Sequence, residues 1–233
     1  MKTAEDFKSG VVLFIDKPMN WTSFQVVNKI RWMLNKKLGI KKIKVGHAGT
    51  LDPLATGLLI LCTGKMTKQI EEYQSKPKTY TGTFRLGGTT PSYDLETAVD
   101  KNFPTDHINA EMIRKTAVQF TGKIEQFPPM YSAVKQAGKR LYELARQGKT
   151  TELKAREVEI MKFDITQIHG LDIDFEVCCS KGTYIRSLIH DFGKALDSGA
   201  HLTALRRTAI GSFSVDEAMT IEEFIDSLHP YQT

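Results

Sequence analysis

Residues 45–59 read VGHAGTLDPLATGLL. In this stretch a glycine-punctuated loop holds the carboxylate of Asp52 and leads directly into residues 58–62, whose shortness and apolar composition predict a buried strand. Pro53 fixes its own φ and biases Asp52 towards an extended conformation. Loops held between rigid elements often carry functional residues. The local pattern also fits an ordinary Asp-Pro turn in which His47 caps a neighbouring carbonyl. Residues elsewhere in the chain are needed to distinguish a functional loop from such a turn.

The composition is that of an ordinary globular chain. Of its 233 residues, 41% are hydrophobic and 25% are charged, which is enough for one sizeable core. No linker, repeat or low-complexity tract divides the chain, so a single domain over residues 1–233 is expected. The first residues lack the apolar core of a signal peptide and three cysteines make no disulfide framework, so we expect a cytoplasmic protein. No apolar run is long enough to span a bilayer, which gives a membrane role no support.

Positive charge is concentrated next to the Asp52 loop. Thirty-two Lys and Arg residues exceed 27 Asp and Glu residues, and the net charge of +5 favours a polyanionic partner. Five lysines stand just before the loop, namely Lys36, Lys37, Lys41, Lys42 and Lys44. They fit a phosphate-binding loop or a solvated one, because a charge run alone does not distinguish the two. The six histidines have no ligand-like spacing with one another or with the cysteines, so no metal site is expected.

The first part of the chain predicts alternating strands and helices. Residues 11–15 predict a buried strand that ends at Pro18. Thr22 or Ser23 then caps a helix. The buried face of this helix is expected to carry Phe24, Val27, Ile30 and Leu34. The apolar spacing in residues 66–73 predicts a second, shorter helix.

Alternation with a period of two marks strands in the rest of the chain, at residues 79–86, 157–165 and 171–179. Helices are predicted before Gly122, after a cap at Thr183 and near the C-terminus. Residues 126–133 are expected to be irregular because two prolines remove backbone donors. An apolar segment at residues 202–205 has no assigned conformation.

Arg186 and Tyr80 are the other residues of chemical interest. Arg186 falls in the first turn of the helix after Thr183, where the helix dipole disfavours a cation. A carboxylate partner relieves that cost, but an exposed arginine that reaches solvent also fits. Tyr80 lies on the apolar face of its strand. This position fits a core tyrosine, and it also fits a ring that stacks on a ligand.

Ordered motifs over almost the whole chain resemble those of the TruB family of tRNA pseudouridine synthases. Members of this family isomerise a uridine in the T loop of tRNA, at position 55. The Asp52 motif reads GHAGTLDPLATG, in residues 46–57. The other motifs read LFIDKP (13–18), TSF (22–24), KTY (78–80), QFPPMYSAVK (126–135), CSKGTYIRSL (179–188) and LRRT (205–208).

The resemblance implies a role for each matching residue. Asp52 would be the nucleophile, Tyr80 would pack against the target base, and Arg186 would pair with Asp52. The base is stacked inside the T loop and must be extruded, and the equivalent of His47 fills the space that the base leaves. Residues that support or line the pocket would be Lys17, Pro18 and Leu205. An anionic nucleophile suits the cleavage and re-formation of a glycosidic bond, and an adjacent guanidinium keeps it ionised and oriented. No metal or organic cofactor is implied.

The family likeness implies an α+β fold, in which a mixed, largely antiparallel sheet is flanked by helices and loops. Two features depart from the family pattern. Residues 89–94 read TTPSYD in place of a Thr-Asp-Thr run, so a second carboxylate for Arg186 would be Asp94 or a group elsewhere. Too few residues follow Thr208 for the C-terminal PUA domain that many members carry. Binding of the tRNA T arm, by a monomer, would then depend on Lys36, Lys37, Lys41, Lys42, Lys44, Arg206 and Arg207.

Two other classes of function remain for comparison. A non-catalytic T-arm binder or tRNA-folding chaperone would keep the RNA-recognition surface, but binding alone needs no nucleophile. The combination of Asp52, Tyr80 and Arg186 therefore favours an enzyme. A nuclease or a metal-dependent base deaminase would need ligand clusters that the sequence lacks.

Overall fold

The computed structural model describes residues 2–132, 134–136, 138–148, 151 and 153–228. The chain divides into two compact units, a first unit of Met1–Tyr80 with Arg206–Thr233 and a second unit of Thr81–Leu205. Two strands, β4 (Lys78–Leu86) and β12 (Ala200–Ile210), contribute residues to both units.

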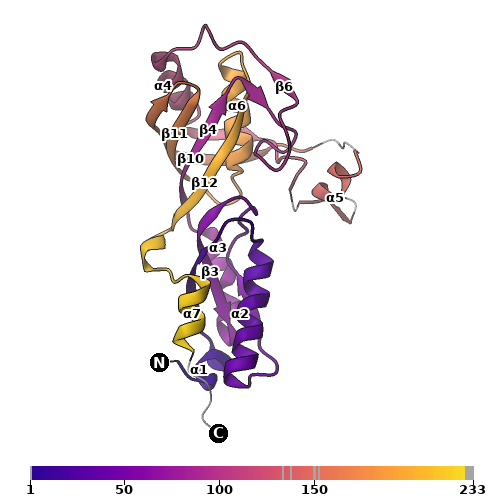
Figure 1. The fold of residues 1–233 in the computed structure, drawn as a ribbon, viewed down its shortest axis with the longest axis vertical. Helices are drawn as coiled ribbons and strands as arrows, with labels where there is room; N and C mark the ends of the chain where they lie inside the picture. The colour runs from indigo at the N-terminus through magenta and orange to yellow at the C-terminus, as the bar shows by residue number, and fades with distance from the viewer. Residues whose placement is uncertain (1, 133, 137, 149–150, 152, 229–233) are drawn as a thin grey trace. The chain divides into compact units, whose positions relative to one another are not determined.

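The first unit combines helices with a small sheet (Figure 1). Its helices are α1 (Ala4–Ser9), α2 (Ser23–Leu38), α3 (Ile70–Ser75) and α7 (Ile221–Ser227), with two 3-10 helices, η1 (Gly64–Gln69) and η2 (Val215–Glu217). Its strands are β1 (Val12–Lys17), β2 (Val45–His47), β3 (Thr56–Thr63) and β13 (Phe213–Ser214), with the first residues of β4 and the last of β12.

Strand β3 is the centre of the first unit. Strand β1 pairs with it antiparallel along one edge, while β2 (antiparallel) and β12 (parallel) share the other edge. Leu59 and Leu61 pack with residues of α2 and α7, whereas Leu58 and Ile60 pack with residues of α3 and β13 on the opposite face. Burial of both faces explains why residues 58–62 are continuously apolar rather than alternating.

The second unit combines the longest strands with helices. Its strands are β5 (Gly88–Thr89), β6 (Lys101–Asn102), β7 (Gly122–Gln126), β8 (Lys135–Gln136), β9 (Lys139–Arg140), β10 (Arg156–His169) and β11 (Asp172–Cys179). Its helices are α4 (Ala110–Gln119), α5 (Leu141–Ala145) and α6 (Ile185–Ala195). No helix in the described ranges of either unit is both long and apolar enough to cross a membrane.

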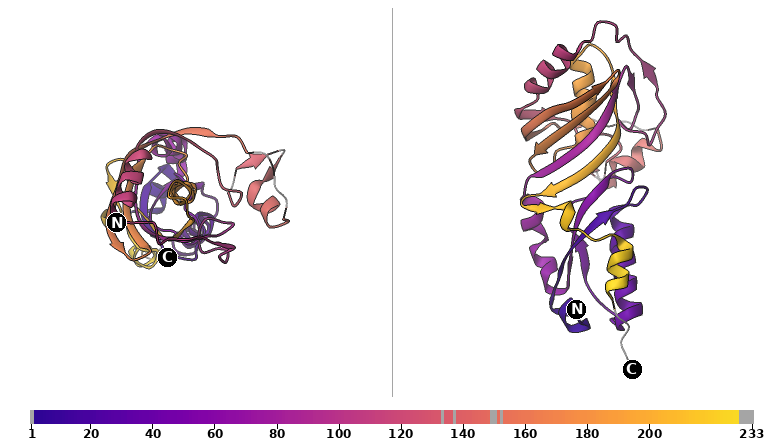
Figure 2. Two further views of the ribbon diagram at one scale, coloured as in Figure 1. Left: turned by 90° about the horizontal axis from the view of Figure 1, so that it is seen from above. Right: turned by 60° about the vertical axis from the view of Figure 1, so that its left-hand side comes forward.

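The sheet of the second unit has the strand order β12-β4-β11-β10-β7, and Figure 2 shows its long strands side by side. Strands β10 and β11 form an antiparallel hairpin, and β7 pairs antiparallel with β10. The core against α6 is aromatic, with the ring of Phe192 5.1 Å from Phe84 and 5.6 Å from Phe163. With the parallel β3–β12 pair of the first unit, these pairings confirm the predicted α+β fold with a mixed, largely antiparallel sheet.

Helix α2 begins as predicted but buries a different first residue. The hydroxyl of Thr22 accepts a hydrogen bond from the Gln25 backbone in a capping box, so Thr22 is the N-cap. The prediction that Phe24 is buried is wrong, because its side chain is 63% exposed. The buried positions are Ser23, Val26, Val27, Ile30, Met33 and Leu34. At 3.6 residues per turn, that stripe leaves position 24 on the outer side of the helix.

Other predicted elements differ in detail. Thr183 does not cap α6, because Tyr184 is the N-cap and the Thr183 hydroxyl donates to the Ser180 carbonyl over 2.9 Å. Residues 66–73 are divided between η1 and α3 rather than forming one helix. Strand β7 was not predicted, and neither was β12, whose apolar half at residues 202–205 continues into the polar residues 206–208. A strand with a polar half has no simple apolar period in the sequence.

Candidate active site

The Asp52 loop connects β2 to β3 and is fastened at both ends. Its first residue, Ala48, donates its backbone N–H to the carbonyl of Ile60 over 2.9 Å. Within the loop, Ala55 donates to the Asp52 carbonyl over 3.1 Å, which closes a turn around the carboxylate. Asp52 is half-buried, and Leu51 and Ala55 in the same loop are buried. The predicted arrangement of a carboxylate held between rigid elements is therefore present.

Ser23 ties this loop to the first residue of α2. The Leu51 backbone N–H donates to the Ser23 hydroxyl oxygen over 2.9 Å, and that hydroxyl lies 3.3 Å from the Leu51 carbonyl. Ser23 is thus buried as a loop anchor and is not the helix cap that its sequence position also suggested. The backbone of Leu51, the residue before Asp52, is therefore hydrogen-bonded to α2 and not to solvent.

Lys17 supports the other side of the loop. Its side chain is 0% exposed, and its Nζ donates to the carbonyls of Pro18 (2.9 Å), Trp21 (2.6 Å) and Pro53 (3.3 Å). Burial lowers the pKa of Lys17 to about 8, and the nearby negative charge of Asp52 opposes this shift. Lys17 therefore places a buried cation near Asp52 and also fixes the carbonyl of Pro53, the residue that follows Asp52. Pro18 itself is exposed and contributes its carbonyl.

Arg207 approaches the same loop from β12. Its Nε donates to the Leu58 carbonyl over 2.8 Å and its Nη2 donates to the Gly49 carbonyl over 3.2 Å. The side chain is only 1% exposed, so Arg207 is not one of the surface charges that were expected to bind the T arm. Arg206 is also occupied, because it forms a two-pronged ion pair with Asp16 at 2.6 and 3.1 Å. Alternating strand positions place one arginine inside the unit and the other at its surface.

His47 lies at the end of β2, immediately before the loop. It is half-buried, and its Nδ1 has no hydrogen-bond partner among the residues that the structure describes. Burial lowers the pKa of His47, the positive charge of Arg207 lowers it further, and a hydrogen bond with the Gly49 backbone opposes both effects. The imidazole is therefore held neutral near pH 7.

Tyr80 is the last residue of the first unit and lies in β4. Its side chain is 8% exposed, in agreement with its predicted place on the buried face of the strand. Two residues earlier, Lys78 is also buried, and its Nζ donates to the carbonyls of Gln74 and Lys76. The Lys-x-Tyr motif thus combines a lysine that closes the end of α3 with a nearly enclosed aromatic ring.

Arg186 belongs to the second unit, where the residue is 3% exposed. It lies in the first turn of α6, as predicted. Its Nη1 donates to the Ser92 carbonyl over 3.0 Å and its Nη2 donates to the Tyr131 carbonyl over 2.9 Å. Its Nε lies 3.5 Å from Oδ2 of Asp94, which is buried as well. Asp94 is therefore a carboxylate that supports Arg186, although the expected Thr-Asp-Thr run is absent. Leu205 is half-buried in β12, at the end of this unit.

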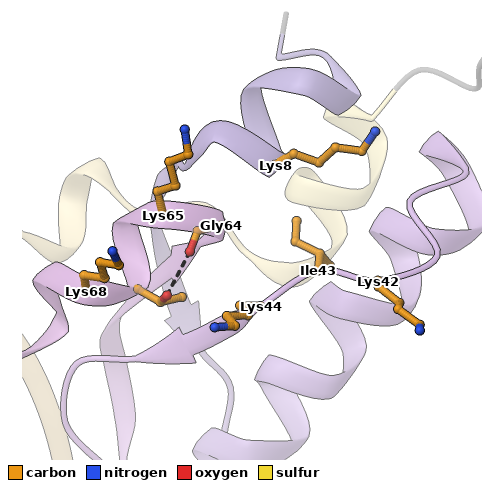
Figure 3. Close-up of a pocket in the computed structure, with 8 residues that line it drawn as sticks. Lys8, Lys42, Ile43, Lys44, Gly64, Lys65 and Lys68 are labelled. Atoms are coloured by element: carbon orange, nitrogen blue, oxygen red, sulfur yellow. Dashed lines mark hydrogen bonds between the residues drawn. The ribbon is translucent and has the colours of Figure 1, made fainter.

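Lysines from three segments gather around a pocket of 310 Å³ in the first unit. Figure 3 shows them around Gly64, namely Lys8 of α1, Lys42 and Lys44 before β2, and Lys65 and Lys68 of η1. Lys42 and Lys44 were predicted to bind RNA, whereas Lys8, Lys65 and Lys68 were missed. The hydrogen bond from Gly64 to the Lys44 carbonyl, at 2.9 Å, joins two of the segments. Lys41 is exposed but does not line this pocket.

The pocket carries little compensating negative charge. Lys8 lies 3.9 Å from the carboxylate of Glu5, and both side chains are exposed. In the described part of the chain, none of the other four lysines forms an ion pair. The same part of the chain contains no group of His, Cys, Asp and Glu side chains that could hold a metal ion.

Comparison with known proteins places the chain among pseudouridine synthases. Residues 33–185 match the family model described as TruB family pseudouridylate synthase (N terminal domain), and residues 186–233 match that of the tRNA pseudouridylate synthase B C-terminal domain. The tRNA pseudouridine synthase B of Flavobacterium johnsoniae is 58% identical over 227 residues, or 97% of this chain and 99% of that protein. The one of Phocaeicola vulgatus is 53% identical over 94% of this chain and 93% of that protein.

Solved structures share the fold of this chain. A chain in a Cbf5-Nop10-Gar1 complex is 31% identical with a TM-score of 0.73, over 97% of this chain and 56% of that chain. A chain in an H/ACA RNP bound to a substrate RNA containing 2'-deoxyuridine is 29% identical with a TM-score of 0.69, over 94% of this chain and 53% of that chain. This chain thus spans just over half the length of those solved chains.

Proposed function

Because this chain belongs to the TruB family of pseudouridylate synthases, we propose that it isomerises uridine to pseudouridine at position 55, in the T loop of tRNA. The observation that carries the proposal is the Asp52 loop. Its half-buried carboxylate lies near the ammonium of Lys17, and its backbone is held by Ser23 and Arg207. A rigid anionic nucleophile is the group that this reaction requires.

Asp52 is the proposed nucleophile. It attacks the uridine and forms a transient covalent bond, the bond between N1 and C1′ breaks, and the uracil turns. C5 then forms the new bond to C1′, the bond to Asp52 breaks, C5 releases its proton and N1 takes up a proton. No atom is gained or lost overall. Arg186 is proposed to pair with Asp52 and to keep the carboxylate ionised and oriented during these steps. The fixed guanidinium, with Ser92, Tyr131 and Asp94 as partners, supports this role.

The base must leave the stacked T loop before it can react, at a cost on the order of a few kcal/mol. Tyr80 is proposed to pack against the extruded uracil, and its nearly enclosed ring suits that task. His47 is proposed to fill the space left in the loop, which a neutral imidazole does without burying a charge. Lys17, Pro18 and Leu205 are proposed to support or line the pocket.

The T arm of tRNA is the proposed partner, bound by a monomer in the cytoplasm without a metal or organic cofactor. Lys41, Lys42 and Lys44 are proposed to bind its phosphates. The exposed ammonium groups of Lys42 and Lys44, at the pocket of Figure 3, support this assignment for these two residues, since lysine binds phosphate as a compact point charge. Lys41 is exposed in the same segment.

The test is release of tritium from C5-labelled uridine in an unmodified tRNA transcript, because isomerisation leaves the mass unchanged. The wild type is expected to release one tritium per tRNA, and position 55 should be the only one converted when the product is mapped. Asp52→Asn should bind the transcript and release none. A wild type that binds tRNA but releases no more tritium than Asp52→Asn would instead establish a non-catalytic T-arm binder or chaperone.

Arg186 gives a second arm to this test. Arg186→Ala is expected to lower the release rate by a factor of about 100 or more, because the charge beside the nucleophile is lost. Arg186→Lys separates charge from geometry, since lysine keeps the charge without the planar donors. Near-wild-type release by Arg186→Ala would remove Arg186 from the proposed mechanism.

A further inference from the structure

Residues 90–94 form a loop that is attached to α6 through Arg186. The Ser92 carbonyl accepts from Nη1 of Arg186 at 3.0 Å, and Oδ2 of Asp94 lies 3.5 Å from its Nε. These two contacts come from the residues on either side of Tyr93. The position of Tyr93 therefore helps to decide where these two partners of the guanidinium lie, whereas the third partner, the Tyr131 carbonyl, comes from another segment.

The ring of Tyr93 stacks on the imidazole of His190. Their centroids are 3.8 Å apart and their planes differ by 11°. His190 follows Arg186 by four residues, so both side chains lie on one face of α6. The loop is thus attached to the helix at two points that are one turn apart.

The backbone at Tyr93 is held in an unusual conformation. Its φ is 64°, in the left-handed region that a bulky side chain disfavours. The Tyr93 N–H donates to the Thr90 carbonyl over 3.1 Å, and its carbonyl accepts from Leu202 of β12 over 2.9 Å. Asparagine would adopt this conformation more readily than tyrosine, so local backbone preference does not account for an aromatic residue here.

The stack is built from two neutral rings. The pKa of His190 is lowered to about 4, first by burial and then by the charge of Lys194, while Asp191 and Asp100 oppose the shift. Burial, Asp191 and Asp100 raise the pKa of Tyr93. The Nδ1 of His190 is buried and has no hydrogen-bond partner among the described residues. The stacking contact with Tyr93 is therefore what holds the imidazole in its position.

We propose that Tyr93 and His190 are a positioning pair for the isomerisation. Their stack holds Ser92 and Asp94 against Arg186 and so sets the orientation of its guanidinium. The inference rests on the proposed function only in that Arg186 acts in the reaction. Neither ring needs to touch the RNA for this role.

The kinetic test compares variants that remove the stack with variants that keep it. Tyr93→Asn removes the ring but suits the left-handed backbone, and His190→Ala removes the partner ring. Tyr93→Phe and His190→Phe preserve two stacked rings. We expect the first two to lower the single-turnover rate about tenfold with an unchanged Kd for tRNA, because small displacements of a catalytic group slow the chemical step. The two Phe variants should stay within about twofold of the wild type.

A control separates positioning from general stability. Ile113 is buried in α4, so Ile113→Ala should lower the Tm without touching the loop. It should leave the rate unchanged at temperatures where the protein is folded. An equal loss of rate in Ile113→Ala at matched Tm, or an undiminished rate in Tyr93→Asn and His190→Ala, would overturn the proposal.

A second measurement does not use activity. The Nε–H resonance of Arg186 in ¹⁵N-labelled protein, assigned by its loss in Arg186→Lys, reports the Asp94 contact directly. It should shift and exchange faster with solvent in Tyr93→Asn and His190→Ala, and stay unchanged in the Phe variants. An unchanged resonance in Tyr93→Asn and His190→Ala contradicts the positioning pair, whereas full activity of Arg186→Ala contradicts the proposed function.

Discussion

Arg207 donates from Nη2 to the carbonyl oxygen of Gly49 across 3.2 Å. Its Nε holds the Leu58 carbonyl at the same time, so one buried guanidinium joins the Asp52 loop to β3. Two carbonyls on either side of the proposed nucleophile thus depend on a single side chain from β12.

Replacement of Arg207 should therefore loosen the loop. Arg207→Met leaves the two carbonyls without their donor and is expected to reduce the free energy of unfolding by about 2–4 kcal/mol, with slower isomerisation. Urea denaturation and tritium release measure the two effects. Arg206→Met, which removes a partly exposed ion pair, serves as the control and should cost less than about 1 kcal/mol. A salt dependence of tRNA binding that changes in Arg207→Met but not in the control would assign Arg207 to phosphate binding instead.

Gly57 should tolerate no side chain. Its φ is 104°, and a Cβ atom there would lie 2.7 Å from the backbone nitrogen of Arg207 and nearer still to its carbonyl oxygen. Gly57→Ala is expected to lower the free energy of unfolding by roughly 2–4 kcal/mol, because backbone atoms must move. Gly39→Ala is the matched control, since Gly39 has φ 66° and open space around it. Equal costs for the two variants in urea titrations would mean that the close approach to β12 is unimportant.

Lys17 should make stability depend on alkaline pH. Its pKa is about 8 in the folded protein, against 10.5 for an ordinary lysine. Between these values the unfolded chain binds a proton that the folded protein has lost, so the free energy of unfolding rises with pH relative to Lys17→Met. Below pH 8 both states are protonated and the difference is constant. Denaturation from pH 7 to 10.5 measures this, and the ¹³Cε shift of Lys17 should titrate near pH 8. Titration near 10.5 would contradict the prediction.

The five-lysine pocket should set part of the salt dependence of tRNA binding. Lys65→Gln with Lys68→Gln is expected to lower the slope of log Kd against log salt by about 1.5, because two phosphate contacts are lost. The control replaces two exposed lysines of the second unit, Lys101→Gln with Lys115→Gln, and removes the same charge. Binding is measured in the Asp52→Asn background over a salt series. Identical slopes for both double variants would exclude a specific role for the pocket.

Local features of this chain were predictable because local sequence encodes them. The uninterrupted apolar residues 58–62 indicated β3, the alternation in residues 171–179 indicated β11, and the first-turn position of Arg186 followed from its helix. Phe24 was misplaced because one residue at the start of a helix can satisfy the apolar spacing and still lie outside the buried stripe. Strand periods and helix caps involve neighbours within a few residues, so they can be predicted without knowledge of the tertiary structure.

The sequence by itself determined the family, the fold class and the loop that carries Asp52. Only the tertiary structure decided that Arg207 is buried against that loop, that Lys8, Lys65 and Lys68 join Lys42 and Lys44 in one pocket, and that Asp94 supports Arg186. These relationships join residues that are distant in the chain, through strand pairing and packing. A charge in the sequence looks the same whether its partner is solvent, phosphate or a buried carbonyl, and folding alone distinguishes them.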